Sequence, residues 1–207
     1  GGTGYDEARG IALDAAGNAY VTGIFQSTAS FGTTNLTSTG NSDVFIVKYD
    51  PAGTVIWARR AGGNADDEAH AIALDGAGNI YITGTFDANA SFGSFSLQNN
   101  SHISDIFVAK TDNLGNFLWA SKAAGDADAD SRAIALDGAT NVYVTGSFAG
   151  TATFGTTNLS ARGTNGLDDA FLAKYSSAGA FVWVQQIGGN GADDGYGVTT
   201  DNVGNVI

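Results

Sequence analysis

The sequence has no cysteine, no methionine and a single proline among 207 residues. Without cysteine, the fold cannot depend on disulfide bonds or thiolate metal sites. Because position 1 is not methionine and the sequence stops inside a repeat, we expect the chain to be a segment of a longer protein. No apolar run approaches the roughly 20 residues of a membrane-spanning helix, so we expect no membrane insertion.

Basic residues are also scarce. The chain has 9 Lys and Arg against 21 Asp and Glu, which gives a net charge of −12. Binding to a nucleic-acid backbone needs clustered Lys and Arg, so no nucleic-acid partner is expected. An anionic membrane surface is disfavoured for the same reason.

The dominant feature that is present is a repeat. Residues 10–25 (GIALDAAGNAYVTGIF) recur as residues 71–86 and 133–148 and begin again at Gly197, at intervals of 61, 62 and 64 residues. We therefore divide the chain into units 1–61, 62–123 and 124–187, with a partial fourth unit at 188–207. No linker separates the units, which indicates one continuous array.

Each unit contains four strand-like runs, which in the first unit are residues 9–14, 19–25, 43–49 and 55–59. The second and third runs are apolar at nearly every position, as in strands that are buried on both faces. Antiparallel hairpins of this kind require sheets stacked on sheets, and four strands per unit is the pattern of propeller blades. The sequence predicts an all-β β-propeller segment with four-stranded antiparallel blades of about 61–64 residues, three complete and a fourth partial.

The turn between the first two runs recurs with an aspartate at its start. Its carboxylate can accept hydrogen bonds from backbone N–H groups inside the turn, and a glycine supplies the positive φ that the turn needs. We assign this structural role to Asp14, Asp75 and Asp137. In the third unit Thr140 replaces the glycine, and we expect it to strain the turn or to change its type.

A polar link of Ser, Thr, Asn and Gly joins the second and third runs, at residues 26–42 in the first unit. Each link keeps a Phe-Gly pair followed by a leucine, represented by Phe31 and Leu36. A disordered loop would not keep two apolar residues at a fixed spacing. We therefore expect an ordered excursion that is anchored to the blade by these two side chains.

The combined strings D-x-x-G-N-x-Y-V/I-T-G-x-F, F-G, D-x-F-x-x-K-Y, G-x-x-x-W-A and G-G resemble the SBBP family, named for a seven-bladed β-propeller. The resemblance covers the whole chain and implies about seven blades in large secreted or surface-attached prokaryotic proteins. It implies no enzyme activity. The link has Phe-Gly where a common form of the family has Phe-Pro. Similarity of the first hairpin to NHL-type propellers implies that the first strand lies nearest the axis.

Asp126, Asp128 and Asp130 alternate like the first ligands of a calcium loop, since hard oxygen ligands suit Ca²⁺. Ser131, however, stands where such a loop needs glycine. The interpretation we favour is a solvated loop between blades, whose carboxylates cap backbone N–H groups or pair with basic residues. The candidate partners are Arg9, His70 and Arg132.

The tryptophans Trp57, Trp119 and Trp183 fall in the fourth runs. Their spacing is similar to the tryptophan-docking motif of quinoprotein propellers, which implies packing between neighbouring blades and not a cofactor. The lysines near the ends of the third runs are expected to be structural as well. They are Lys48, Lys110 and Lys174.

His70 and His102 are the only histidines, and neither has a histidine or cysteine partner at ligand spacing. No nucleophile elbow or catalytic carboxylate pair stands out. We predict a non-enzymatic structural, adhesive or interaction module of a secreted or cell-surface prokaryotic protein, with no cofactor. Expected partners are a protein or glycan surface, further blades of the same polypeptide, or another copy bound through open blade faces. The alternatives are a propeller that binds a small ligand or carbohydrate, with or without calcium, and an enzyme whose site lies on other blades.

Overall fold

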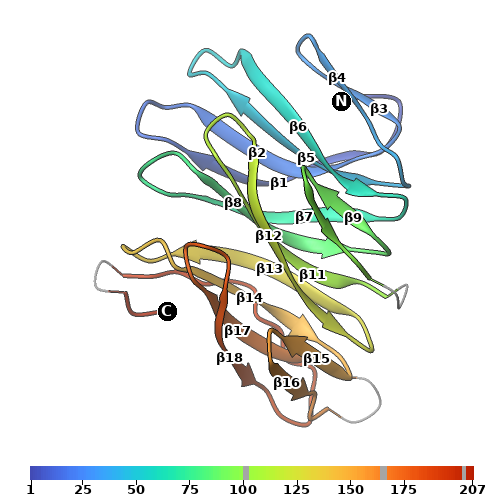
Figure 1. The fold of residues 1–207 in the computed structure, drawn as a ribbon, viewed down its shortest axis with the longest axis vertical. Helices are drawn as coiled ribbons and strands as arrows, with labels where there is room; N and C mark the ends of the chain where they lie inside the picture. Colours follow the sequence, from blue (N-terminus) through green and yellow to red (C-terminus); the bar gives the residue numbers. More distant parts are fainter. Residues whose placement is uncertain (100–102, 164–166, 202–203) are drawn as a thin grey trace.

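The computed structural model describes residues 1–99, 103–163, 167–201 and 204–207. All regular secondary structure assigned within these ranges is β-strand, and the ranges contain no helix able to cross a bilayer. Three four-stranded blades lie one beside the next along the long axis of the molecule (Figure 1) and do not close into a ring; a link hairpin extends each of the first two into a six-stranded sheet. The prediction of an all-β segment built of propeller blades is confirmed. His102 lies outside the described residues.

The three blades have the same strand order. Blade 1 contains β1 (Asp6–Leu13), β2 (Ala19–Phe25), β5 (Asp43–Tyr49) and β6 (Val55–Gly63). Blade 2 contains β7 (Asp67–Leu74), β8 (Ile80–Phe86), β11 (Asp105–Thr111) and β12 (Phe117–Gly125). Blade 3 contains β13 (Ala129–Leu136), β14 (Val142–Phe148), β17 (Asp169–Tyr175) and β18 (Phe181–Ile187). Neighbouring strands within each blade pair antiparallel in chain order.

The hydrophobic core lies between the blades. Every residue of β8 and β14 is buried, as their unbroken apolar pattern predicted. One core cluster joins Ile46 of blade 1 to Ile82 and Phe107 of blade 2, and the next joins Val108 of blade 2 to Val144 of blade 3. Burial of these faces against one another holds the sheets in a stack, since apolar area removed from water stabilises in proportion to its extent.

Within the described residues each polar link forms a short hairpin, as expected for an ordered excursion. The hairpin strands are β3 (Thr28–Phe31) and β4 (Thr34–Thr37), β9 (Ala90–Phe92) and β10 (Phe95–Leu97), and β15 (Thr151–Phe154) and β16 (Thr157–Ser160). Each of the last two hairpins pairs with the outer strand of the preceding blade, β9 with β6 and β15 with β12. This pairing explains why β6 extends to Gly63, beyond the predicted end at residue 59. The phenylalanine of each link is buried in the core, as Phe92 shows at 4.6 Å from the ring of Phe107.

The first strand of each blade begins earlier than the sequence suggested and contains a β-bulge. In β1 the register shifts between Ala8 and Gly10, so that Arg9 is the additional residue. The same shift leaves His70 extra in β7 and Arg132 extra in β13. The first strands of consecutive blades are also neighbours, β1 beside β7 and β7 beside β13. Because each bulge adds one residue at the same place in its strand, these three residues occupy equivalent positions in neighbouring strands.

The segment after blade 3 occupies the place of a further first strand. The N–H of Gly195 donates to the carbonyl of Gly146 at 3.2 Å, and the hydroxyl of Thr200 donates to the carbonyl of Leu136 at 2.7 Å. β6 and β12 continue past residues 61 and 123, where the repeat placed the ends of the first two units. The unit boundaries drawn from the repeat stay predictions.

Candidate functional site

The bulged residues are linked to acidic residues in a continuous chain across the first strands. Each bulged residue follows an acidic residue by two positions, which gives the pairs Glu7 and Arg9, Glu68 and His70, and Asp130 and Arg132. Opposite the bulge, the second strand needs a residue without a side chain. A Cβ at Gly84 would lie 1.8 Å from the carbonyl oxygen of Glu68, and Gly23 and Gly146 are equally close to their partners.

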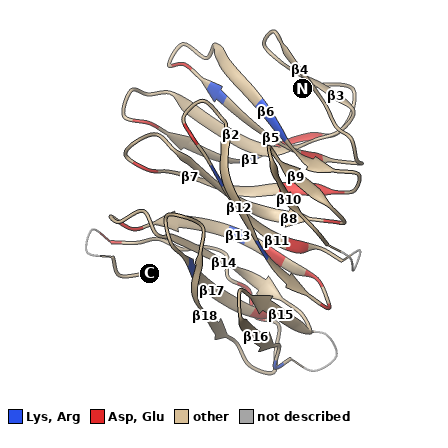
Figure 2. Ribbon diagram, viewed as in Figure 1, with Lys and Arg blue, Asp and Glu red and all other residues tan. Residues whose placement is uncertain are grey.

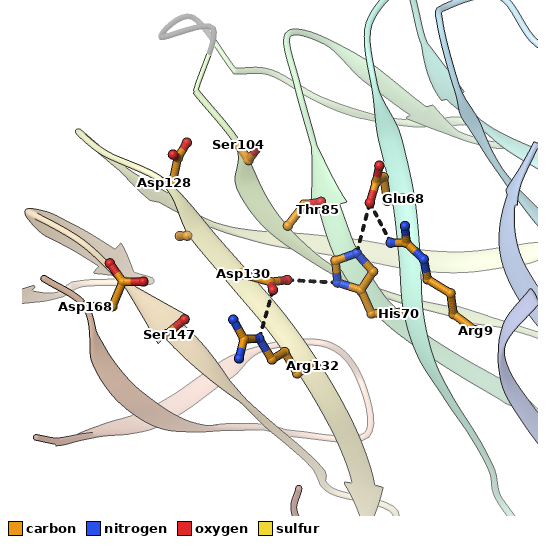
Figure 3. A pocket seen from close by; sticks show the side chains of 11 residues that line it. Arg9, Glu68, His70, Thr85, Ser104, Asp128, Asp130, Arg132, Ser147 and Asp168 are labelled. Atoms are coloured by element: carbon orange, nitrogen blue, oxygen red, sulfur yellow. Dashed lines mark hydrogen bonds and ion pairs between the residues drawn. The ribbon is translucent and has the colours of Figure 1, made fainter. Parts of the chain in front are cut away.

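Contacts between blades join these pairs end to end (Figure 3). Arg9 Nη1 donates to Glu68 Oε2 at 2.5 Å, and Glu68 Oε2 lies 3.3 Å from His70 Nε2. His70 Nδ1 lies 2.8 Å from Asp130 Oδ1. Arg132 Nη1 continues to Asp194 of the fourth unit at 3.0 Å. We call the set Glu7, Arg9, Glu68, His70, Asp130, Arg132 and Asp194 the inner ladder.

His70 is the central cation of the inner ladder. Both of its ring nitrogens face acceptors, because Nδ1 lies 2.9 Å from the carbonyl oxygen of Ser131 in addition to its contact with Asp130. Burial alone would lower the pKa of His70, but hydrogen bonds to Asp130 and Glu68 outweigh it and raise this pKa to about 9. The hydrogen bond from His70 in turn lowers the pKa of Glu68 to about 2. His70 is therefore an imidazolium at neutral pH and positions the strands.

A cavity of about 330 Å³ lies beside the inner ladder, between blades 2 and 3. The ladder forms one side, and the other lining residues are Thr85, Ser104, Asp128, Ala129, Ser147 and Asp168. Thr85 is only 8% exposed, and its hydroxyl has no hydrogen-bond partner within the described part of the chain. The carboxylates of Asp128 and Asp168 likewise have no hydrogen bond or ion pair with any described residue. In Figure 3 both lie at the end of the cavity away from Arg9.

The free carboxylates arise where the repeats differ. At the boundary of blades 1 and 2, Asp66 accepts a hydrogen bond from Ser42 at 2.7 Å. At the next boundary, the corresponding Ser104 donates instead to Asp87 at 2.7 Å, and this leaves Asp128 without that partner. One blade further, Asp168 replaces the serine itself. Small sequence differences in a repeated frame thus produce one acidic cavity.

The calcium candidates have different surroundings. Asp126 Oδ1 accepts the backbone N–H of Thr151 at 2.6 Å, Asp128 lines the cavity, and Asp130 belongs to the inner ladder. Across the described ranges, no group of three His, Cys, Asp or Glu side chains could hold a metal ion. The pairing of acidic residues with Arg9, His70 and Arg132 that we favoured from sequence is present in the structure.

The aspartates that begin the first-hairpin turns have no free oxygen for a ligand, as the second unit shows. Asp75 Oδ1 accepts the N–H groups of Ala77 and Asn79 at 3.0 and 2.9 Å. Its Oδ2 accepts from the side chain of Asn79 and the hydroxyl of Tyr81. Although burial acts to raise the pKa of Asp75, these bonds hold it below its usual value. Asp14 and Asp137 accept the same four bonds, while Lys48, Lys110 and Lys174 lie over the tyrosines at 4.8 Å.

The tryptophans connect one blade to the next. Trp57 Nε1 donates to the carbonyl of Asn113 at 3.2 Å, and Trp119 Nε1 donates to that of Ser177 at 3.1 Å. Trp183 has no such hydrogen bond with a described residue, although its ring packs against Tyr143 as the other two pack against their tyrosines.

Two buried carboxyl groups, Asp43 and Asp67, meet at the boundary of blades 1 and 2, and both are fully buried. Asp43 pairs with Arg60 at 2.6 Å, while Asp67 accepts the N–H of Gly63 at 2.6 Å and its Oδ1 has no partner. Burial, reinforced by the neighbouring Asp43, raises the pKa of Asp67 to about 8. In blade 3 the position of Asp67 is taken by Ala129.

The inner ladder as a connected site was not foreseen from the sequence. Its signal was an acidic residue two positions before Arg9, His70 or Arg132, which places the two side chains on one face of a strand. The contacts between blades depend on the bulge and on the spacing of the sheets. Neither can be read from one strand.

Comparisons with known proteins also point to a propeller architecture. Residues 56–88 and 182–207 match the SBBP family, described as a beta-propeller repeat. An uncharacterized WD repeat-containing protein of Acanthamoeba polyphaga mimivirus is 29% identical over 185 residues, which cover 80% of this chain and 13% of that protein. Two segments of the chain therefore match the SBBP beta-propeller repeat, in agreement with the resemblance of its sequence motifs.

Proposed function

We propose that this chain is part of a non-enzymatic propeller that binds another macromolecule at the cavity between blades 2 and 3. The supporting observation is that the polar side chains around that cavity fall into two groups, one bonded to its neighbours and one not. The groups suited to proton transfer, His70 and Glu68, are bonded to each other and to their neighbours, whereas Asp128 and Asp168 have no partner among the described residues. A rigid frame with free hydrogen-bond acceptors at its surface is suited to recognition.

The similarity to a WD repeat-containing protein agrees with this proposal, since radial blade architectures present rigid binding faces. The chain spans 13% of the length of that relative. Any partner of a longer protein that contains this chain is therefore also a proposal. Acidic composition and the resemblance to secreted SBBP proteins favour an extracellular or cell-surface location. Fractionation of the source cells with an antibody against the chain would test this location.

A second candidate surface is provided by the outer hairpins, which would suit adhesion to glycans. Their alternate residues point outward and carry hydroxyl or amide groups. The exposed side chains are Thr28, Ser30, Asn35, Thr37, Ser91, Ser96, Thr151, Thr153, Asn158 and Ser160. Such uncharged donors and acceptors can bind sugar hydroxyl groups.

Peptide and glycan arrays probed with the 207-residue chain would test the proposal and separate the two surfaces. Asp128→Arg reverses an exposed charge in the cavity, and Ser91→Arg introduces the same side chain on an outer hairpin. We expect array binding that is lost in Asp128→Arg and kept in Ser91→Arg. The reverse result would move the function to the hairpins, and binding to neither array would contradict an interaction role.

A further inference from the structure

Two arginines differ from the other basic side chains of this acidic protein. The structure describes every lysine and arginine, and all of them except Arg59 and Arg162 form an ion pair with a described Asp or Glu. Acidic residues outnumber basic ones by 21 to 9, so a shortage of carboxylates does not explain the exceptions. Arg59 also departs from the repeat, since Ser121 and Gln185 take its place in blades 2 and 3.

The guanidinium group of Arg59 is held at the boundary of blades 1 and 2. Its Nη1 donates to the carbonyl of Ala58 and its Nη2 donates to the carbonyl of Leu114, both at 3.0 Å. Its Cζ lies 5.4 Å from the ring centre of Trp57, which is only 8% exposed. Both carbonyls are neutral, and a guanidinium group carries more N–H donors than they use. Arg59 therefore keeps donors and a positive charge for a ligand.

Asp112 is affected by the charge of Arg59 but forms no ion pair with it. Its Oδ1 accepts the N–H groups of Leu114 and Asn116, and its Oδ2 accepts the side chain of Asn116, all at 2.9 Å. Burial acts to raise the pKa of Asp112, but these bonds, together with the charge of Arg59, hold it below its usual value. The Asp112 carboxylate is thus bound within its own turn, and Arg59 can still bind another anion.

Arg59 lines a cavity of about 360 Å³ between β6 and two turns of blade 2, which we call the Arg59 cavity. The other lining residues are Arg60, Gly93, Ser94, Gly115, Asn116 and Phe117. Both turns touch the walls, since a Cβ at Gly115 would lie 2.7 Å from Arg59 Cγ and a Cβ at Gly93 would lie 3.3 Å from Phe117 Cβ. Any larger residue at Gly115 would displace Arg59.

The charge of the Arg59 cavity favours a singly charged anion. Arg60 pairs with Asp43 at 2.6 Å, so Arg59 is the one cation of the described lining without a carboxylate partner. A doubly charged phosphate group would exceed this single positive charge, in a chain whose net charge is already −12. A carboxylate carries one charge, and its two oxygens match the planar donor fork of an arginine.

The neutral lining residues indicate what carries the carboxylate. Ser94 offers an exposed hydroxyl group, and Asn116 donates to Asp112 through Nδ2, so its Oδ1 remains an acceptor. Sugar hydroxyl groups both donate and accept, as these two side chains together do. Ser94 also lies in the turn of the β9–β10 hairpin, whose exposed Ser91 and Ser96 extend the same polar surface.

We propose that the Arg59 cavity binds the carboxylate of an acidic sugar, a uronic acid residue within a glycan. This inference rests on the second candidate surface, the outer hairpins, and names the class of sugar that they bind. Arg59 binds the carboxylate, and Ser94 and Asn116 bind hydroxyl groups of the sugar. A volume of about 360 Å³ lies at the lower end for small-ligand pockets and suits a single sugar ring.

Titration calorimetry of the whole chain with three probes would test the proposal. The probes are trigalacturonic acid, its full methyl ester, and an acetylated and amidated tripeptide with a central glutamate. The ester keeps every hydroxyl group but has no negative charge, so we expect it to bind at least about tenfold more weakly than the acid. Equal affinity for acid and ester would refute the role of the carboxylate. Tighter binding of the tripeptide would indicate an acidic protein partner and contradict the sugar assignment.

Arg59→Gln should weaken binding of trigalacturonic acid by about tenfold, as expected for loss of a charge-assisted hydrogen bond. Arg162→Gln is the matched control, because it removes the same charge from the other arginine without an ion pair, which does not line the Arg59 cavity. Equal weakening in both variants would indicate a general charge effect and refute a specific site.

Ser94→Glu tests the same cavity without removing the contact between Arg59 and Leu114. It places a negative charge in the lining and should abolish binding of trigalacturonic acid. Ser96→Glu adds the same charge two residues further along the hairpin, outside the lining, and should leave binding in place. Unchanged melting temperatures would show that both variants fold, and retained binding in Ser94→Glu would overturn the proposal.

The inference and the proposed function fail in different ways. If the glycan array shows binding that Ser91→Arg abolishes and Arg59→Gln leaves intact, the hairpins bind glycans and the uronic acid site is wrong. If trigalacturonic acid binds as expected but Asp128→Arg abolishes no array signal, the uronic acid site is supported and the cavity between blades 2 and 3 is not the binding site.

Discussion

Asp67→Asn should make the protein more stable at neutral and alkaline pH. The wild-type carboxyl group is fully buried, its Oδ1 has no partner, and its pKa is raised to about 8. The asparagine oxygen can still accept the N–H of Gly63, which the carboxylate accepts at 2.6 Å. The substitution therefore removes a titrating group and keeps the local hydrogen bond.

The sign follows from proton linkage. The folded protein holds a proton on Asp67 up to about pH 8, whereas the unfolded chain releases it near the ordinary aspartate pKa of 3.8. The contribution of Asp67 to stability is fully present below the unfolded pKa and is lost as pH rises through the folded pKa. A difference of about four pKa units corresponds to a loss on the order of 5 kcal/mol as an upper bound, and relaxation around the charge will reduce it.

Urea unfolding followed by tryptophan fluorescence, repeated from about pH 4 to pH 9, measures this difference. We expect wild type and Asp67→Asn to agree within about 1 kcal/mol at the acidic end and to diverge steadily as pH rises. Asp126→Asn, an exposed control, should not diverge in this way. A constant difference between wild type and Asp67→Asn across the range would refute a buried, protonated Asp67.

Three further predictions concern the inner ladder, the turns and the blade contacts. His70→Gln should lower the free energy of unfolding by up to about 3 kcal/mol near pH 6, where the contribution of the raised His70 pKa is fully present. This loss should vanish as pH rises through about 9, whereas His70→Arg should keep the stability without this pH dependence. Chemical denaturation at several pH values would measure both effects. Thr140→Gly should raise the melting temperature through a gain of about 1 kcal/mol, because Thr140 keeps the turn at φ 61°, and the reciprocal Gly78→Thr should lower it. Trp119→Phe should cost about 1 kcal/mol more in urea unfolding than Trp183→Phe, since of these two indoles only that of Trp119 donates to a described carbonyl. Equal losses would contradict a role for that hydrogen bond.

Thr140 also illustrates what sequence reasoning could and could not decide. Its position predicted either strain or a changed turn, and the structure shows the unchanged turn, with the N–H of Thr140 donating to Asp137 at 2.8 Å. The bonds that Asp137 accepts hold the threonine in a backbone region that favours glycine. The local sequence identified the backbone strain at Thr140, and the hydrogen bonds to Asp137 determined that the turn keeps its type.

The acidic residues give a second comparison. Figure 2 shows them at strand ends and turns in all three blades. From sequence, Asp126, Asp128 and Asp130 form one group at alternate positions. In the fold they separate into a backbone cap, a cavity wall and a ladder residue, because the bulge at Arg132 and the approach of β7 determine which partner each carboxylate meets.

The sequence by itself determined the blades of this protein. The local properties that determined them are the repeat spacing, the strands that are apolar at every position and the turns that begin with aspartate. A strand that is apolar on both faces must be buried on both, and stacked sheets achieve this burial. Tertiary structure alone decided the inner ladder, the buried Asp43 and Asp67, and the cavity lined by Thr85, Asp128 and Asp168. These features join residues from different blades. Their distances depend on bulges and on how closely the sheets approach, which side-chain packing determines only when the whole stack is formed.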